Sequence, residues 1–386
     1  NLPSSPSAGD IVSVKDYART FGDNAVTVGR NGSNIDGTAA NGTLETSGLS
    51  VTLIYMDASR GWSLINDDTT AMLGAEYVAA TGGTITTVCT NYKVHTFTGP
   101  GTFTVTNAGN CGGSNTVDYL VVAGGGAGGY ANGGGAGGGA GGLRYSASTY
   151  CNPSPSGGAA GSALPVSAQG YPITVGGGGS GQTGSPDYKS GGDGANSIFS
   201  TITSAGGGGG AGGCTPGSTS PGAKGNSGGS GGGGGKTANP GSAPCKGVGG
   251  AGNTPPVSPS QGNDGGDGGI PNPNFGGGGG GHAAAGQDAV APSNDGGDGG
   301  AGSVVTINGS ATTYAGGGGG NAEGQPAPAQ GQGGAGGGAA GKAPGANGNA
   351  GTANTGGGGG GIDSVPSPYT SGGGGSGIVI IRYRFQ

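Results

Sequence analysis

GGGGGG, at positions 276–281, is an unbroken run of six glycines, and similar runs recur along most of the chain. A Gly/Ser-rich stretch is first interpreted as a flexible linker, because glycine loses more conformational freedom on folding than any other residue. Many separate linkers in one chain would be unusual. The other glycine-rich blocks lie at 124–142, 176–181, 206–213, 228–235, 296–302, 316–320, 333–341, 356–361 and 372–377.

The alternative interpretation is a bundle of polyglycine II helices. These helices resemble polyproline II, with three residues per turn, a rise of about 3.1 Å per residue and no internal hydrogen bonds. Their N–H and C=O groups must therefore pair between neighbours, which requires backbones to approach closely. The residues that interrupt the runs are mostly Ala and Ser, whose side chains obstruct such packing least. We therefore favour the bundle over the flexible linker.

The composition excludes several classes of protein. The 386 residues include 109 glycines and 23 prolines, but the glycines form homopolymeric runs and not a G-X-Y repeat, so a collagen is excluded. Charged residues make up 8% of the chain and the net charge is −6, without a basic patch for nucleic acid. No apolar stretch approaches the roughly 20 residues that span a bilayer, so we expect a chain that is not membrane-inserted.

The N-terminal part, residues 1–67, is predicted to be a β module. Apolar residues alternate with polar ones at 11–14, 25–28 and 49–55, which is the period of a half-buried strand. Trp62 is expected to anchor the core of this module, since its side chain buries a large area.

A connector at 68–83, with one short helix from Thr69 to Ala80, is predicted next. A β-hairpin module follows at 84–117, in which the strands 93–98 and 102–106 flank a turn that contains Pro100.

The last part, 118–386, is predicted to be the glycine-rich bundle domain. Short β segments each adjoin a glycine run, which suggests that the chain leaves a small β base, follows a run, turns at a tip and returns. The fold class is thus mainly β and irregular, with small β modules followed by a polyglycine II bundle over a β base. The segments lie at 119–123, 143–145, 171–175, 197–202, 304–307 and 378–385.

This last part resembles the glycine-rich domain of phage tail-fibre proteins. The resemblance rests on DYLVVAGGGAGG at 118–129, YAGGGGG at 314–320, NTGGGGGG at 354–361 and GGGGSGIVIIRY at 372–383. It is similar in principle to the polyglycine-sandwich adhesins at the tips of long tail fibres. The resemblance implies a virion protein, extracellular and a homotrimer, that works with other fibre proteins and binds a host-cell surface receptor, either an outer-membrane protein or a polysaccharide.

Aromatic and basic residues in the expected tip loops are the candidates for receptor binding. Aromatic faces pack on sugars or apolar patches, and lysines meet phosphate or carboxylate groups. Any one of these residues could instead stabilise its own loop. The candidates are Tyr130, Tyr188, Lys189, Lys224, Lys236, Phe275, His282 and Tyr369.

The five cysteines never form a C-x-x-C pair, which argues against a zinc site. Disulfides of an extracellular particle are the better interpretation. Cys89 with Cys111 and Cys214 with Cys245 are the pairs we expect, and Cys151 is left over.

A Gly-Gly-Asp-Gly element occurs at 191–194, 265–268 and 296–299. Such carboxylates could bind calcium, but the regular nine-residue spacing of calcium-binding repeats is absent, and Asp that accepts hydrogen bonds from backbone N–H groups is the simpler interpretation. We expect no cofactor and no enzymatic activity, because only His95 and His282 are available and neither lies in a nucleophile motif.

Three functions compete. A viral adhesin is the first, a secreted structural filament or surface protein is the second, and an ice-binding protein is the third. The loops between the runs vary in length and composition, which disfavours the repeated face of an ice-binding protein.

Overall fold

The computed structural model describes residues 1–65, 76–110, 113–146, 161–183, 188–213, 223–236, 247–269, 275–289, 295–323, 329–363 and 368–386. These ranges contain β-strands and irregular segments but no α-helix, so the expectation of a mainly β chain is confirmed. None of the described residues therefore forms a helix able to cross a membrane. Two compact units are present: Asn1–Ala79 with Asn107–Asn115 and Arg384–Gln386, and Ala80–Thr106 with Thr116–Tyr383.

Two antiparallel sheets form the N-terminal part of the first unit. Strand β4 (Ser50–Asp57) lies between β1 (Ile11–Lys15) and β5 (Gly61–Leu64), and β2 (Val26–Val28) pairs with β3 (Gly42–Leu44). The alternation of β4 buries Val51 and Leu53 on one face. The pattern that predicted half-buried strands thus has the expected structural cause.

Trp62 is fully buried in the core of this unit, as predicted. Its ring meets that of Tyr55 at 5.5 Å between centroids, in an edge-on arrangement. Buried Leu44 and Leu53 belong to the same cluster, and Val12 and Val14 of β1 pack against it while only partly buried.

The remaining strands of the described chain form further sheets. The orders are β12-β10-β21-β8-β7, with β13 also paired to β10, then β17-β16-β14-β9-β6, and β18-β19. Their bounds are β6 Val78–Thr81, β7 Thr84–Val88, β8 Tyr92–Phe97, β9 Gly101–Ala108, β10 Thr116–Val122, β12 Leu143–Tyr145, β13 Leu164–Pro165, β14 Gly170–Thr174, β16 Ser197–Phe199, β17 Ile202–Ser204, β18 Ser303–Val305, β19 Thr312–Tyr314 and β21 Ile378–Arg384.

Strands β10 and β21 are the central antiparallel pair of the second unit, with Leu120 opposite Ile380. Both strands are almost wholly buried, which explains their continuous apolar sequences. Their register also places Asp118 opposite Arg382, whose guanidinium lies 3.3 Å from the carboxylate. This buried ion pair was not predicted, although an acidic residue in one apolar strand and a basic residue in the other are a signal for it.

The predicted hairpin between 93–98 and 102–106 is wrong. Strand β8 pairs with β7 and β21, whereas β9 pairs with β14 and β6 in another sheet. The turn reverses the chain, but the two strands meet through side chains and not through backbone edges. The rings of His95 and Phe103, one from each strand, lie 5.1 Å apart and nearly perpendicular.

The expected helix from Thr69 to Ala80 is wrong in the part that can be judged. Residues 66–75 lie outside the described ranges, and Val78–Thr81 form strand β6.

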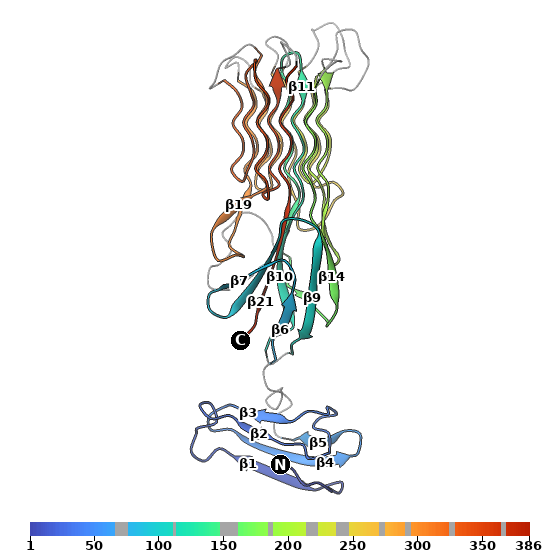
Figure 1. The fold of residues 1–386 in the computed structure, drawn as a ribbon, viewed down its shortest axis with the longest axis vertical. Helices are drawn as coiled ribbons and strands as arrows, with labels where there is room; N and C mark the ends of the chain where they lie inside the picture. Colours follow the sequence, from blue (N-terminus) through green and yellow to red (C-terminus); the bar gives the residue numbers. More distant parts are fainter. Residues whose placement is uncertain are drawn as a thin grey trace. The chain divides into compact units, whose positions relative to one another are not determined.

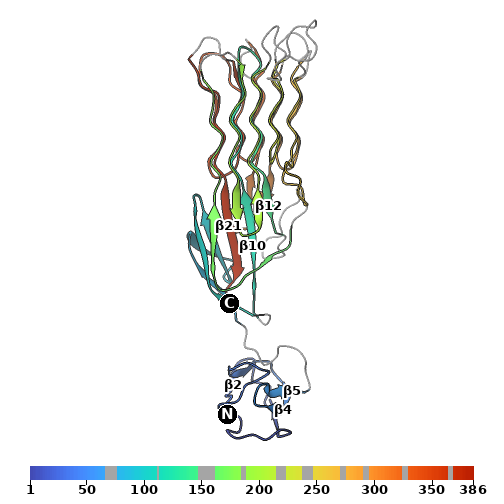
Figure 2. The ribbon, with the colours of Figure 1, turned by 90° about the vertical axis from the view of Figure 1, so that its right-hand side faces the viewer.

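The glycine runs of the second unit lie side by side as extended segments that bond to one another (Figures 1 and 2). Successive N–H groups donate to three different neighbouring runs and return to the first after three residues. The acceptors of residues 124–129 are, in order, the carbonyls of Ala195, Gly375, Gly139, Gly192, Gly372 and Ala136.

The run 276–281 has the same period of three. Its acceptors are, in order, Asn321, Gly234, Gln287, Gly318, Gly231 and Ala284. A β-strand alternates between two sides, so these runs satisfy their backbones differently from a sheet.

Only glycine fits at most positions of these runs. A Cβ atom on Gly278 would lie 1.9 Å from the carbonyl oxygen of Asp298. The predicted need for close backbone approach is therefore met by direct backbone packing.

Candidate functional site

The candidate site lies at the ends of the glycine runs that are farthest from the sheet of β10 and β21, which we call the β11 end (Figure 1). A small sheet closes this end. Strand β11 (Tyr130–Ala131) pairs antiparallel with β15 (Tyr188–Lys189) and parallel with β20 (Ile362–Asp363). The site therefore combines segments that are far apart in the sequence.

The turn after β11 is built from glycines and held by side chains. Gly133 and Gly134 have φ of 74° and 70°, a conformation that residues with a side chain rarely adopt. Their N–H groups donate to the carboxylate of Asp363 at 3.1 Å and to the side-chain oxygen of Asn321 at 3.2 Å. Side chains from two other segments thus hold the turn in place.

Two of the predicted residues, Tyr188 and Lys236, are brought together at this end. The ammonium nitrogen of Lys236 lies 5.1 Å from the centroid of the Tyr188 ring and donates to the carbonyl of Asn132. The neighbouring Lys189 donates to the carbonyl of Thr183 at 2.9 Å. Tyr188, Lys189 and Lys236 are all half-buried, so each keeps part of its surface in solvent.

Lys224 and Tyr369 also lie at the β11 end, as the hydrogen bonds of the residues next to them indicate. Lys224 is exposed and follows Ala223, whose carbonyl accepts from Gly235, next to Lys236. Tyr369 is half-buried and precedes Thr370, which bridges to Thr183.

Tyr130 and Phe275 are buried, so the expectation that they are exposed is wrong. Both side chains have no accessible surface. Tyr130 lies in the middle strand of the end sheet, and Phe275 bridges to Ala322. These rings cover the β11 end of the glycine runs, because the glycines themselves have no apolar side chains to do so.

His282 lies at the opposite end of the runs, which is a second correction. Its N–H donates to the carbonyl of Ala315, which adjoins β19, and its ring lies 6.5 Å from that of Tyr145 in β12. The Nδ1 atom is 2.6 Å from the Ser303 hydroxyl. Burial lowers the pKa of His282 below its usual range, and a hydrogen bond to the Ser260 backbone opposes this effect. The sequence alone did not indicate at which end of its run this residue lies.

The aspartates of the Gly-Gly-Asp-Gly elements accept hydrogen bonds from backbone N–H groups of neighbouring runs. Asp193 accepts from Gly209 at 2.8 Å, Asp267 from Gly249 at 2.9 Å and Asp298 from Gln332. Backbone capping is therefore what these carboxylates do in the structure. Among the described residues, no three His, Cys, Asp or Glu side chains are grouped as metal ligands would be.

Cys89 is bonded in a disulfide. The residues Cys111, Cys151, Cys214 and Cys245 lie outside the described ranges, so the predicted pairing stays a prediction.

Residues 96–384 match the family described as glycine-rich domain. The chain belongs to this family. No curated protein matches the sequence.

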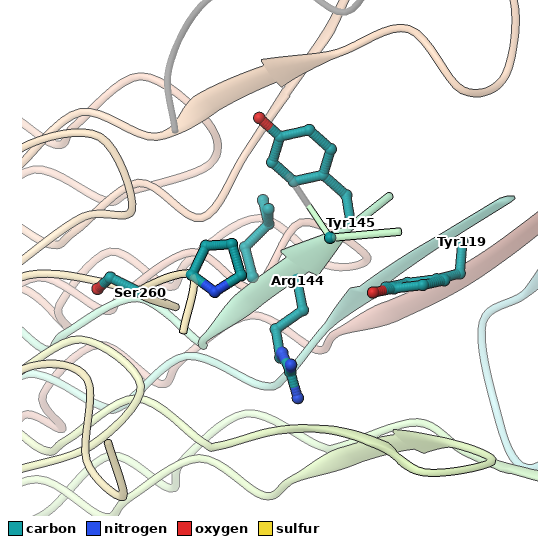
Figure 3. A pocket seen from close by; sticks show the side chains of 7 residues that line it. Tyr119, Arg144, Tyr145 and Ser260 are labelled. Carbon is teal, nitrogen blue, oxygen red and sulfur yellow. The ribbon is translucent and has the colours of Figure 1, made fainter. Parts of the chain in front are cut away.

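The glycine-rich domain also contains a small pocket near its sheets, which sequence reasoning missed (Figure 3). The side chains of Arg144 and Tyr145 leave β12 in opposite directions, as neighbours in a strand do. The pocket is lined by Tyr119, Leu143, Arg144, Tyr145, Gly161, Pro259 and Ser260.

The polar side chains that line this pocket are those of Tyr119, Arg144, Tyr145 and Ser260. Burial raises the pKa of Tyr119, and the charge of Arg144 opposes this effect. The Arg144 guanidinium lies 3.5 Å from the carbonyl of Thr203. None of these described lining residues is His, Asp, Glu or Cys.

Proposed function

We propose that the chain is a phage tail-fibre or fibre-tip adhesin, in which a bundle of polyglycine II helices presents receptor-binding loops to a host-cell surface. The period of three in the hydrogen bonds of 124–129 and 276–281 supports the bundle, since polyglycine II has three residues per turn. Donors pointing to three sides hold each run among several neighbours. Such a bundle would be a stiff support for a binding surface.

The observation that carries the proposal is the gathering of aromatic and basic side chains at the β11 end. The glycine runs present almost no side chains, so selectivity must come from the segments that join them. Tyr188, Lys189 and Lys236 combine an aromatic face with two ammonium groups. This chemistry suits a receptor that carries sugars together with phosphate or carboxylate groups.

The rest of the proposal concerns the setting of the protein. The disulfide at Cys89 supports an extracellular location, because disulfides persist in oxidising environments. We therefore propose a non-enzymatic virion protein that assembles with other fibre proteins. Its receptor would be an outer-membrane protein or a polysaccharide.

Adsorption to host cells tests the binding end. Particles that carry Tyr188→Ala with Lys236→Ala should lose most of their adsorption, because the aromatic face and one ammonium group disappear together. Lys93→Ala in β8, a lysine away from the β11 end, is the matched control and should adsorb as the parent does. Equal adsorption by all three particles would refute this assignment of the binding end.

Hydrogen exchange tests the bundle. Amides of the runs 124–129 and 276–281 should exchange slowly, since each has a backbone acceptor in a neighbouring run. Exchange at the rate of an unstructured peptide would contradict the bundle and favour flexible linkers. Negative-stain microscopy separates the adhesin from its alternative, because long homopolymers would favour a structural filament.

A further inference from the structure

We propose that the outer edge of strand β1 is an interaction surface for a second copy of the same chain, and that two copies join by antiparallel pairing of their β1 strands. This inference is independent of the proposed receptor binding. It rests on the first unit alone. It differs from the homotrimer expected from the resemblance, because pairing of identical edges generates a two-fold dimer.

The hydrogen-bond pattern shows which backbone groups of β1 face outward. Asp16 donates to the carbonyl of Leu49 at 2.8 Å, and Tyr55 donates to the carbonyl of Asp10 at 2.8 Å. Both bonds join even-numbered residues of this segment to β4. Because donors alternate along an antiparallel ladder, the N–H groups of Ile11, Ser13 and Lys15 point away from β4.

The edge lacks most of the features that protect sheet edges from pairing. Such protection usually comes from prolines, bulges, inward charges or a covering segment. Strand β1 is at the edge of its sheet, and within the described chain the backbone bond on its outer side lies at its end, where Tyr17 donates to the carbonyl of Lys15 at 3.0 Å and leaves that oxygen one further lone pair. Lys15, at one end, is its one charged residue, and Ile11 is 61% exposed.

The strand is self-complementary when two copies run antiparallel with Ser13 opposite Ser13. All five residues then pair, with Ile11 opposite Lys15 of the other copy and Val12 opposite Val14. The outward N–H groups of Ile11, Ser13 and Lys15 would each meet a carbonyl group. A parallel arrangement would instead bring the two Lys15 side chains together, where their like charges repel.

Pairing would also extend the core of the unit. Val12 and Val14 pack against the buried cluster around Leu53 and Trp62 but are only partly buried. In the proposed register Val12 of one copy lies opposite Val14 of the other. These two residues share no backbone hydrogen bonds, and side chains approach most closely in cross-strand pairs of this kind. The five-residue strand makes a small interface, so the dimer should be weak and depend on protein concentration.

Sedimentation equilibrium of the full chain, over a wide range of concentration, tests the dimer. We expect a reversible monomer-dimer equilibrium. Ser13→Pro removes the central outward donor and leaves the backbone bonds to β4 in place, although it also removes the 3.0 Å bond between the Ser13 and Thr52 hydroxyls. It should raise the dissociation constant at least about tenfold. Ser13→Thr keeps the donor and is the control. A chain that stays monomeric, forms trimers, or dimerises equally well with Ser13→Pro would overturn the proposal.

A second pair of variants tests the register and does not depend on whether Ser13→Pro folds. Ile11→Glu would face Lys15 of the other copy, whereas Ile11→Lys would place two positive charges opposite each other. Both changes remove the same exposed side chain, so the difference reports the cross-strand charges. We expect Ile11→Glu to dimerise about three- to tenfold more tightly than Ile11→Lys. Equal affinities, or the reverse order, would overturn the register.

Discussion

The first unit and the glycine runs of the second unit are stabilised by different parts of the chain. In the first unit, buried side chains such as Leu44, Leu53 and Trp62 form an ordinary apolar core. In the runs, the closest packing is between backbones, and a Cβ on Gly278 would overlap the carbonyl oxygen of Asp298. The two regions should therefore be destabilised by opposite changes. Truncation of a side chain destabilises the first unit, whereas addition of a side chain destabilises the glycine runs.

This difference also bears on how each region can evolve. A core of side chains tolerates volume-conserving substitutions, because neighbouring rotamers adjust. A core of backbone atoms has no rotamers to adjust, so change is confined to the turns and loops. That restriction favours placing recognition at the ends of the runs, where residues such as Tyr188 and Lys236 occur.

The largest effect is expected from Gly278→Val. The added side chain must displace a backbone carbonyl that itself belongs to a bonded run, so unfolding free energy should fall by about 5 kcal/mol or more. Chemical denaturation of the full chain measures it. If the valine variant does not fold, Gly278→Ala is measured in its place. An unfolding free energy unchanged by Gly278→Ala would contradict the close backbone packing at this position.

A smaller loss is expected from Leu53→Ala in the first unit. Truncation of this fully buried side chain leaves a cavity and should cost about 2–5 kcal/mol. Hydrogen exchange should place the weakening in the first unit and leave amides of the run 276–281 protected. Equal loss of protection in both regions would contradict the separation between the two kinds of core.

A still smaller change in the free energy of unfolding is expected from pH, because the second unit contains buried histidines. His95 bonds to the carbonyl of Gly82 through Nδ1 at 2.7 Å, so its neutral ring accepts from the Tyr383 hydroxyl through Nε2. Burial lowers the pKa of His95, and of His282, below the value of 6.5 in an unfolded chain. The unfolded state then binds more protons, and stability falls as pH drops below 6.5 towards the lower native pKa.

The slope cannot exceed about 1.4 kcal/mol per pH unit for each histidine. Thermal unfolding at a series of pH values measures it. His95→Gln and His282→Asn should each flatten the decline, and an unchanged slope in both variants would refute this account.

The smallest effect is expected from Gly177→Ala, the matched control for Gly278. Gly177 also lies in a glycine run, but a Cβ there would meet no atom within 4 Å. Alanine should be neutral or raise stability by about 0.4–1 kcal/mol, since it restricts the unfolded chain. A loss as large as that of Gly278→Ala would show that glycine is needed for its flexibility and not for close packing.

The strands were well predicted where alternation or apolar runs were strong. Val51 to Tyr55 and Leu120 to Val122 lie in strands, and Trp62 is in the core. Pairing was less predictable, as the division of β8 and β9 between two sheets demonstrates. The choice depends on side chains such as His95 and Phe103, which meet across sheets, and a local turn pattern carries no information about that contact.

The candidate site was predicted in part. Tyr188, Lys189 and Lys236 lie at one end with exposed surface, but Tyr130 and Phe275 are buried there and His282 lies at the other end. Residue type indicated what these side chains could bind. Exposure depended on which runs surround each residue, and this could not be read from the adjoining sequence.

The sequence by itself determined that the glycine runs need backbone partners, because they have no side chains with which to build a core. It also determined where strands and turns interrupt them. Only the tertiary structure decided which run bonds to which, such as 276–281 to Asn321, Gly234 and Gln287. The physical reason is that glycine runs are chemically alike and cannot select a neighbour. Their order is set by the strands and turns at their ends, whose contacts join residues far apart in the chain.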